Sequence, residues 1–243
     1  RPAVLVRPLP WLDPAHPAFP PGEAALDEPP GLLAAGGDLS PEWLEAAYGA
    51  GIFPWFDDHS PILWWCPEPR AVIRPGEARI GRTLRRRLAR TDYRVTMDSA
   101  FGDVIRACAA PRDGSGGTWI TEEMIAAYVA LHERGTAHSV EVWIDGALAG
   151  GLYGVALGRA FFGESMFTRR TDASKIAFVH LLGQLGAWDF PLVDCQMPNP
   201  HLERLGVGAM ARGAFLREVT ELVARPAVPA PWRMSWGWRA PGE

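Results

Sequence analysis

The sequence predicts a fold of the α+β class, in one large domain or two smaller ones. Three observations lead to this prediction. Residues 138–200 have the pattern of three alternating strands, an amphipathic helix and a last strand. Residues 1–31 are dense in proline, and a predicted helix over residues 41–50 is followed by short aromatic segments.

Composition is that of an ordinary globular protein. With 48% hydrophobic and 21% charged residues, the chain has enough apolar side chains for a core. No apolar run approaches the roughly 18–20 residues of a membrane span, and the proline-rich start has no basic segment followed by an apolar one. Cys66, Cys108 and Cys195 are scattered, which argues against a disulfide framework or a cysteine zinc site. We therefore expect a cytoplasmic protein in a reducing compartment, without a membrane partner.

The first 31 residues are expected to form an arm or a wrapped extension. Prolines throughout residues 1–31 disfavour regular structure beyond short extended pieces. Ser40 followed by Pro41 predicts an N-cap and the first position of a helix that runs to about Ala50, with Gly51 ending it.

Two aromatic segments follow this helix and contain Trp55, Trp64 and Trp65. Two of these three indoles are expected in the core. At least one can instead face a ligand, because tryptophan offers a flat surface on which bases or aromatic side chains stack.

Nine arginines lie between Arg70 and Arg94, opposed only by Glu77 and Asp92. A helix is predicted here at about residues 83–90. The net charge of −4 does not by itself indicate a nucleic-acid partner, so this local cluster matters more. The pattern is typical of a solvated helix face, and a phosphate-binding surface is the alternative.

The next elements are assigned from alternation and capping residues. Residues 93–97 alternate like a strand, Asp98 is expected to cap the helix that follows, and Thr121 is expected to cap a second helix that ends near Arg134. The glycine-rich loop over residues 111–117 does not match GxxxxGK[ST], so no phosphate loop of that type is expected.

A β-meander is predicted directly after this helix. Val140 and Val142 begin an alternating strand, Asp145 and Gly146 form a two-residue hairpin turn, and a second alternating run follows through residues 152–157. A third apolar strand, an amphipathic helix from about residue 172 and a last short strand complete the pattern.

Polar side chains follow the last two strands and define the candidate site. Glu164 follows the third strand of the meander, and Asp194, Gln196 and Asn199 follow the final strand. Two acids and two amides at strand ends can bind an amine and direct its lone pair. The alternative for Asp194 is a strand-end carboxylate bonded to backbone N–H groups. A nucleophilic Ser165 is disfavoured, because its segment lacks the GxSxG pattern.

Many short segments follow one another in a recognisable order across about residues 19–220. These are GLLAAGGDLS, GIFPWF, PILWWCPEPRAV, GTWIT, HSVEVW, GGLYGVALG, FFGESMF, DASK, DCQ and HLERLG. In these segments the chain resembles the bacterial leucyl/phenylalanyl-tRNA–protein transferase family. The resemblance implies a small N-terminal α/β domain, over residues 1–70, and a C-terminal domain of the GNAT acyltransferase fold, over residues 71–243. It also implies an aminoacyltransferase that moves Leu, Phe or Met from aminoacyl-tRNA to the N-terminal Arg or Lys of proteins, which marks them for degradation.

The resemblance also implies roles for the polar residues. Glu164 matches the acid associated with recognition of the acceptor's N-terminal residue. Asp194, Gln196 and Asn199 match the family's proposed catalytic and hydrogen-bonding groups. We expect Asp194 to act through Gln196 when the attacking amine loses its proton.

Further matches concern the tRNA end and the transferred side chain. Trp55 and Trp119 match tryptophans that contact the terminal adenosine. The family's pocket for the transferred side chain corresponds to Leu152, Phe161, Phe162 and Val193. The chain departs from the family at two of these, with Leu152 where methionine can occur and Phe162 where a smaller residue can.

The implied reaction requires positioning rather than a cofactor. The acceptor amine attacks an ester that is already activated, so orientation and oxyanion stabilisation suffice, and we expect no metal and no other cofactor. The arginine-rich helix is expected to hold tRNA phosphates through Arg82, Arg85, Arg86, Arg87 and Arg90. We expect a monomer.

Two other function classes remain open. A GNAT enzyme that uses acetyl-CoA would carry [RQ]xxGx[GA] before its pyrophosphate-binding helix, whereas the nearest match, residues 203–208, begins with glutamate and follows the final strand. A non-catalytic tRNA-binding module would explain the arginines and tryptophans, but it would leave the polar residues at the strand ends without a task.

Overall fold

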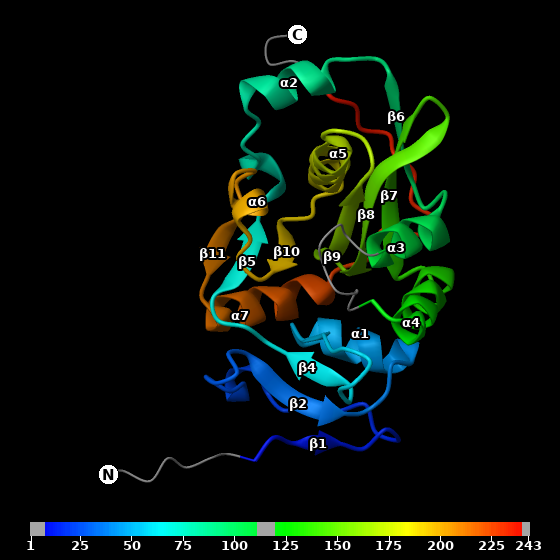
Figure 1. Cartoon of the computed structure of the whole chain (residues 1–243). Coiled ribbons are helices and arrows are strands. Elements are labelled where there is room, and N and C mark those ends of the chain that lie inside the picture. The colour runs from blue at the N-terminus through cyan, green and yellow to red at the C-terminus, as the bar shows by residue number, and fades with distance from the viewer. Residues whose placement is uncertain (1–7, 111–119, 240–243) are drawn as a thin grey trace.

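The computed structural model describes residues 8–110 and 120–239, which form two sheets with helices packed against them (Figure 1). The small sheet consists of β1 (Trp11–Leu12), β2 (Leu32–Gly36), β3 (Phe53–Pro54) and β4 (Leu63–Trp65), in the order β1-β2-β4-β3. Only β1 and β2 pair in parallel in this sheet. Its core contains stacked indoles, because Trp64 lies 5.9 Å from the ring of Trp43, and both are buried.

The large sheet has seven strands in the order β11-β5-β10-β9-β8-β7-β6. The strands are β5 (Arg70–Ile73), β6 (Tyr93–Met97), β7 (Ala137–Ile144), β8 (Ala147–Leu157), β9 (Ala160–Thr168), β10 (Leu192–Gln196) and β11 (Gly208–Met210). The predicted meander is confirmed as β7-β8-β9. Asp145 and Gly146 have φ values of 53° and 75°, as a tight hairpin turn between β7 and β8 requires.

Seven α-helices lie in the described part of the chain. They are α1 (Pro41–Gly49), α2 (Arg82–Leu88), α3 (Phe101–Ala109), α4 (Glu122–Glu133), α5 (Ala173–Ala187), α6 (Pro200–Glu203) and α7 (Arg212–Val223), and there are short 3-10 helices η1 (Gly22–Ala24) and η2 (Pro75–Glu77). Thr121 caps α4 as predicted, because its side chain accepts a hydrogen bond from the N–H of Met124. No described helix is both long and apolar enough to cross a bilayer.

Alternation along the central strands divides the core between the two faces of the large sheet. Leu152 and Phe161 belong to the cluster around α5, whereas Tyr153 and Phe162 belong to a second cluster with residues of α1, α3, α4 and α7. That second cluster also contains buried residues of the small sheet, such as Trp64. The mixed architecture predicted from the sequence is confirmed, and the division at residue 70 stays a prediction.

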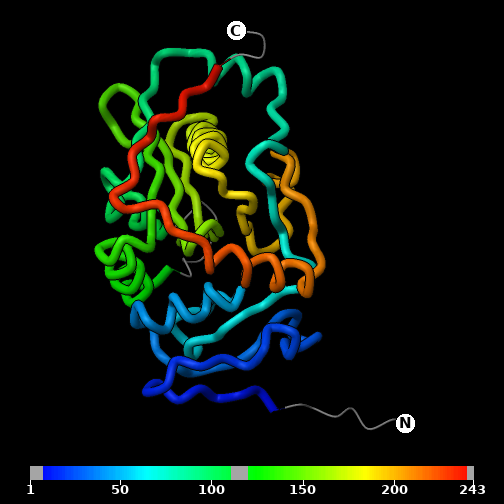
Figure 2. Tube along the Cα trace, turned by 180° about the vertical axis from the view of Figure 1, so that it is seen from behind, coloured from blue at the N-terminus to red at the C-terminus, as the bar shows by residue number. Residues whose placement is uncertain are grey.

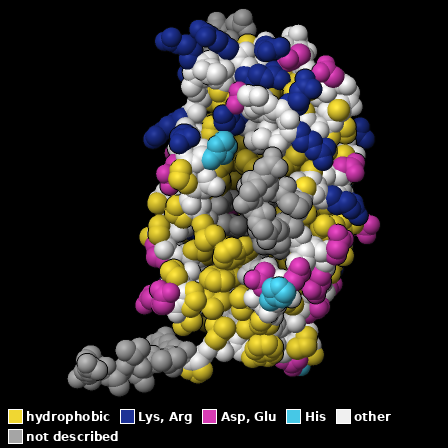
Figure 3. Space-filling model, in the orientation of Figure 1, with side chains coloured by type: hydrophobic (Ala, Val, Ile, Leu, Met, Phe, Trp, Pro, Cys, Tyr) yellow, Lys and Arg dark blue, Asp and Glu magenta, His cyan; other side chains and the backbone are white. Residues whose placement is uncertain are grey.

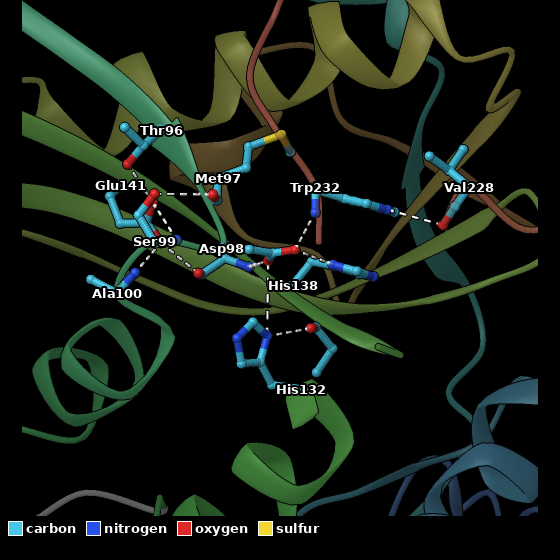
Figure 4. A network of polar contacts seen from close by, with 12 residues as sticks. Thr96, Met97, Asp98, Ser99, Ala100, His132, His138, Glu141, Val228 and Trp232 are labelled. Carbon is cyan, nitrogen blue, oxygen red and sulfur yellow. Dashed lines mark hydrogen bonds and ion pairs between the residues drawn. The ribbon is translucent and has the colours of Figure 1, made fainter. Parts of the chain in front are cut away.

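The prediction that Asp98 caps α3 is wrong. The helix begins at Phe101, and the carboxylate that accepts hydrogen bonds from the backbone just before it belongs to Glu141 of β7. Asp98 instead binds His138 Nδ1 at 2.8 Å and accepts a hydrogen bond from the backbone N–H of Trp232 at 2.7 Å (Figure 4). The cause is tertiary, because the left-handed backbone at Asp98 (φ 53°) accompanies these contacts with segments far away in sequence.

The C-terminal segment packs back on the large sheet. It leaves α7 and runs along the back of the molecule toward α2 (Figure 2). The indole of Trp232 is 2% exposed and stacks on the ring of His138, with centroids 3.6 Å apart. Further along, the backbone N–H groups of Ser235 and Trp236 donate to Gln184 on α5.

Candidate active site

A cavity of about 880 Å³ opens where β9 and β10 separate. These parallel strands pair only from Leu192 opposite Ala160 to Asp194 opposite Phe162, and beyond this point they diverge. Volumes in this range are typical of sites for small ligands. The residues predicted from the sequence that line the cavity are Trp55, Leu152, Phe161, Glu164, Val193, Gln196 and Asn199.

A β-bulge in each diverging strand lies at the cavity. In the pairing of β8 with β9, Tyr153 lies opposite Ser165 and Gly154 lies opposite Gly163, so Glu164 is the extra residue. In β10, Cys195 is the extra residue relative to β5. Bulges re-aim the side chains of a strand. They therefore account for the meeting of Glu164 and Gln196 across the gap. The prediction that Glu164 follows its strand is wrong, because β9 continues through the bulge to Thr168, whereas Gln196 is the last residue of β10.

Glu164 is held from one side of its carboxylate. Its Oε1 accepts hydrogen bonds from Gln196 Nε2 at 2.8 Å and from the hydroxyl of Tyr48, which in turn contacts the hydroxyl of Tyr128 at 2.5 Å. Its Oε2 is buried and has no hydrogen-bond partner among the described residues. Burial raises the pKa of Glu164 to about 8, because an anion is poorly solvated there. A carboxylate with one free oxygen suits a cationic ligand.

Asp194 lies behind the cavity wall rather than in it. Both its oxygens accept from the guanidinium of Arg70, at 2.8 Å for Nε and 2.7 Å for Nη2, and the pair is almost completely buried. Arg70 also donates to the carbonyl of Gly51 and lies against the ring of Phe215. The negative charge of Asp194 raises the pKa of Arg70 against the opposing effect of burial, so this guanidinium stays charged.

Asp194 is connected to the cavity through Gln196. Asp194 Oδ1 accepts a hydrogen bond from the backbone N–H of Gln196 at 2.9 Å, and Gln196 adopts a left-handed backbone conformation with φ 67°. Few residues other than glycine adopt this conformation without local support. Asp194 provides that support and so aims the Gln196 side chain at Glu164. Asn199 lies exposed at the N-cap of α6, where its side chain accepts from the N–H of His201.

The predicted aromatic residues divide between the cavity and the core. Trp55 is 39% exposed, lines the cavity and is supported by Trp65, whose indole N–H donates to the carbonyl of Trp55. Phe162 is fully buried on the other face of β9, 5.4 Å from the ring of Tyr48, and it is not among the lining residues. Its alternation with Phe161 causes this difference. Trp119 lies outside the described residues.

The predicted tRNA-binding arginines are remote from the cavity. They belong to α2 and the turn after it, at the end of the molecule opposite the small sheet (Figure 1), and none of them lines the cavity. Figure 3 shows the Lys and Arg side chains gathered at this end. Arg87 and Arg90 share Asp92 as an ion-pair partner, whereas Arg82, Arg85 and Arg86 are exposed.

Sequence reasoning missed Arg70, Tyr48, which donates to Glu164, and Tyr128, which contacts Tyr48. Arg70 lies in the segment PILWWCPEPRAV, but nothing local indicates that it would bind an acid 124 residues away. Tyr48 has the spacing of an ordinary core residue of α1, together with Leu44 and Ala47. Only the tertiary structure reveals their roles.

Comparison with known proteins assigns the chain to a family. The model of the leucyl/phenylalanyl-tRNA protein transferase matches residues 72–220, and the model of that protein's N-terminal domain matches residues 37–68. The chain belongs to the leucyl/phenylalanyl-tRNA protein transferase family. Members of this family are aminoacyltransferases, and the chain is therefore an enzyme of that class.

Relatives of similar length support this assignment. The leucyl/phenylalanyl-tRNA–protein transferase of Nitrosomonas europaea is 59% identical over 214 residues, which cover 88% of this chain and 91% of the relative. The protein of the same name from Azoarcus sp. is 56% identical, over 92% of this chain and 95% of the relative. The predicted family is confirmed.

Solved structures show only a distant likeness. A GCN5-related N-acetyltransferase from Kribbella flavida matches with a TM-score of 0.38 and 11% identity, over 68% of this chain and 59% of that one. L-PGS from Bacillus licheniformis matches with a TM-score of 0.41 and 11% identity, over 65% of each chain. TM-scores this low do not decide the fold family, so the predicted GNAT-type assignment of this transferase stays a prediction.

Proposed function

We propose that this transferase moves Leu, Phe or Met from aminoacyl-tRNA to the N-terminal Arg or Lys of an acceptor protein. The ester bond to the tRNA breaks, a peptide bond forms, and the tRNA leaves with a free ribose hydroxyl. The observation that carries the proposal is one cavity with an apolar wall and a buried acid with a free oxygen, in a chain of this family. The two parts suit an apolar donor side chain and a cationic acceptor.

The apolar part of the cavity is the proposed site for the transferred side chain. Leu152, Phe161 and Val193 are each at most 3% exposed and come from three neighbouring strands. A rigid wall of this kind selects by shape, with about 1–3 kcal/mol for each misplaced methylene. We infer that it separates γ-branched Leu from β-branched Ile on this basis.

The acidic part is the proposed site for the acceptor. Glu164 offers one oxygen that no described residue occupies, and a guanidinium or ammonium group of the acceptor would donate to it. Cation binding also offsets the burial of the carboxylate, because it supplies the missing opposite charge. An acceptor with an N-terminal Ala cannot make this contact.

Positioning supplies most of the proposed catalysis. The aminoacyl ester is already activated, so holding the acceptor amine against it replaces a bimolecular encounter by an intramolecular step. Gln196 and Asn199 present amide groups at the cavity and are the proposed hydrogen-bonding groups for the reacting atoms. Asp194 acts through Gln196, whose backbone it holds. The attacking ammonium loses two protons overall: one is released when the free amine forms, and the other passes to the leaving ribose oxygen as the peptide bond forms.

Two regions are proposed to hold the tRNA. Trp55, exposed at the cavity, offers a ring on which the terminal adenosine stacks. The arginines of α2 offer charge for the phosphates of the acceptor stem, farther from the cavity. We propose that the enzyme acts as a cytoplasmic monomer without acyl-CoA, and that its product is marked for degradation.

Transfer of radiolabelled Leu or Phe from charged tRNA to two peptides tests the proposal. One peptide begins with Arg and the other with Ala. We expect transfer to the Arg peptide alone, which would establish both the reaction and the acceptor rule. Absence of transfer to either peptide while tRNA still binds would overturn the proposal in favour of a tRNA-binding module.

A further inference from the structure

Three fully buried tyrosines surround Glu164, and they differ in what their hydroxyls do. Tyr48 of α1 donates to Glu164, Tyr128 of α4 contacts Tyr48, and Tyr153 of β8 has no hydrogen-bond partner among the described residues. Burial raises the pKa of all three phenols. All three phenols therefore stay protonated over the working range of pH, and a hydroxyl that has an acceptor within reach can donate to it.

Counting protons gives the hydroxyl chain a direction. Tyr48 has a single hydroxyl proton, and it donates that proton to Glu164 Oε1. The hydrogen bond between the two phenols therefore requires Tyr128 as the donor. Two donors arranged in series end on one carboxylate oxygen, and the Gln196 amide adds another at the same atom. Donors of this kind stabilise the anion rather than the neutral acid.

Groups from several elements influence the charge of Glu164, and the hydrogen bond from the Tyr48 hydroxyl is the strongest effect that favours the anion. The groups that act on it are Tyr48 from α1, Tyr128 from α4, Tyr153 from β8, Asp194 and Gln196 from β10 and Arg70 from β5. Asp194 and Arg70 form a buried ion pair with each other, and they act on the pKa of Glu164 in opposite directions, Asp194 raising it and Arg70 lowering it. Burial remains as the main force against the anion, and the donors at Oε1 oppose it.

We propose that Tyr48 and Tyr128 are positioning residues of the acceptor site, which set the charge on Glu164 and keep its Oε2 free for the acceptor cation. This inference rests on the proposed function of Glu164. Neither tyrosine touches the acceptor. The Tyr48 hydroxyl donates to Oε1, and Tyr128 orients that hydroxyl. The negative charge is then available at Oε2, which has no partner among the described residues.

Tyr48→Phe and Tyr153→Phe form a matched pair for the test. Each substitution removes one hydroxyl from a fully buried ring near Glu164, but only Tyr48 donates to the carboxylate. We expect the acid limb of kcat/KM for the Arg peptide to move up by about one pH unit in Tyr48→Phe, because a hydrogen bond to a charged group is lost. At a pH below the acid limbs of both enzymes, kcat/KM of Tyr48→Phe should be about tenfold lower than that of the unmodified enzyme. At high pH the two values should become equal. Tyr153→Phe should keep the limb of the unmodified enzyme.

A second measurement separates this inference from the proposed function. The pKa of Glu164 is followed in the full chain without substrates, by the carboxyl ¹³C signal as pH is varied. We expect a higher pKa in Tyr48→Phe, a smaller rise in Tyr128→Phe and no change in Tyr153→Phe. Equal titration in Tyr48→Phe and Tyr153→Phe would overturn the inference, and so would an activity loss that high pH does not restore. If the unmodified enzyme transfers nothing, the proposed function fails, while the titration of Glu164 still decides the role of the tyrosines. If Tyr48→Phe does not fold, Tyr128→Phe takes its place in both measurements.

Discussion

Arg70 and Asp194 form a bidentate ion pair in the interior of the protein, with Nε 2.8 Å from Oδ1 and Nη2 2.7 Å from Oδ2. Their side chains are 0% and 2% exposed. The pair joins β5 to β10 directly behind the cavity. Two charges are retained in a buried place only when each satisfies the other. The same carboxylate also holds the backbone of Gln196, so the ion pair links the stability of the sheet to the geometry of the site.

Arg70→Met is expected to destabilise the protein by about 3–5 kcal/mol, because it leaves Asp194 as an unpaired buried charge. The free energy of unfolding from chemical denaturation measures this effect. The double variant Arg70→Met with Asp194→Leu serves as the control, since it removes both charges and should recover much of the stability. A loss below about 1 kcal/mol in the single variant would contradict the importance of the pair.

Asp194→Asn is expected to reduce turnover by about 100-fold with little change in tRNA affinity. The substitution keeps the size of the side chain but weakens its hold on Arg70 and on the N–H of Gln196. Single-turnover transfer and tRNA binding measured on the same preparation separate the two effects. Transfer equal to that of the unmodified enzyme would remove Asp194 from the mechanism.

Binding of the Arg peptide is expected to strengthen as pH rises. Glu164 has a pKa of about 8 in the free enzyme, so it is mainly protonated below that pH and must lose its proton to pair with a cation. Affinity should therefore fall about tenfold for each pH unit below 8, and binding should release a proton. Calorimetry at several pH values, in buffers of different ionisation enthalpy, measures both. Glu164→Gln should bind weakly with no such dependence, and a flat profile in the unmodified enzyme would argue against this role.

Affinity for tRNA is expected to fall steeply with salt, because phosphate contacts release counterions. Arg86→Gln should reduce the slope of log affinity against log salt by about one if Arg86 contacts one phosphate. Arg225→Gln removes an exposed arginine after α7 and is the control, for which we expect the original slope. A salt response that is flat, or equal in the two variants, would show that α2 does not hold the tRNA.

Trp232→Ala is expected to destabilise the protein by about 3–5 kcal/mol, as is typical when a large buried aromatic side chain is removed. The indole stacks on His138, and the backbone N–H of Trp232 anchors the C-terminal segment to Asp98 (Figure 4). Trp11 is 71% exposed, so Trp11→Ala provides a control with little expected change. Denaturation curves compare the two. Similar curves would mean that the C-terminal segment adds little to stability.

Much of the local structure follows from sequence pattern. Strand alternation predicts the meander and the strand over residues 93–97, and the pair Asp145-Gly146 predicts the turn. These features depend on residues that are close together in sequence. The steric preferences of such short segments are the same in any fold, so the sequence is sufficient to predict them. The capping rule succeeds at Thr121. It fails at Asp98, because residues far away in sequence, such as His138, bind the Asp98 carboxylate.

The candidate site is predictable in its members but not in its connections. Glu164 and Gln196 could be named because polar residues follow apolar runs in the sequence, although Glu164 lies within β9, and a series of ordered motifs also indicated the family. Phe162 shows the limit of this approach, since its neighbour Phe161 lines the cavity while Phe162 supports Tyr48 from the core. A one-residue step along a strand changes the face on which a side chain lies.

The sequence by itself determined the order of helices and strands in the central stretch, the family and the polar residues of the candidate site. Only the tertiary structure decided that Arg70 neutralises Asp194 and that Tyr48 donates to Glu164. These partners lie 124 and 116 residues apart. Periodicity reports which face of an element is apolar, whereas the order of strands in a sheet and the packing of helices against it determine which distant side chains meet.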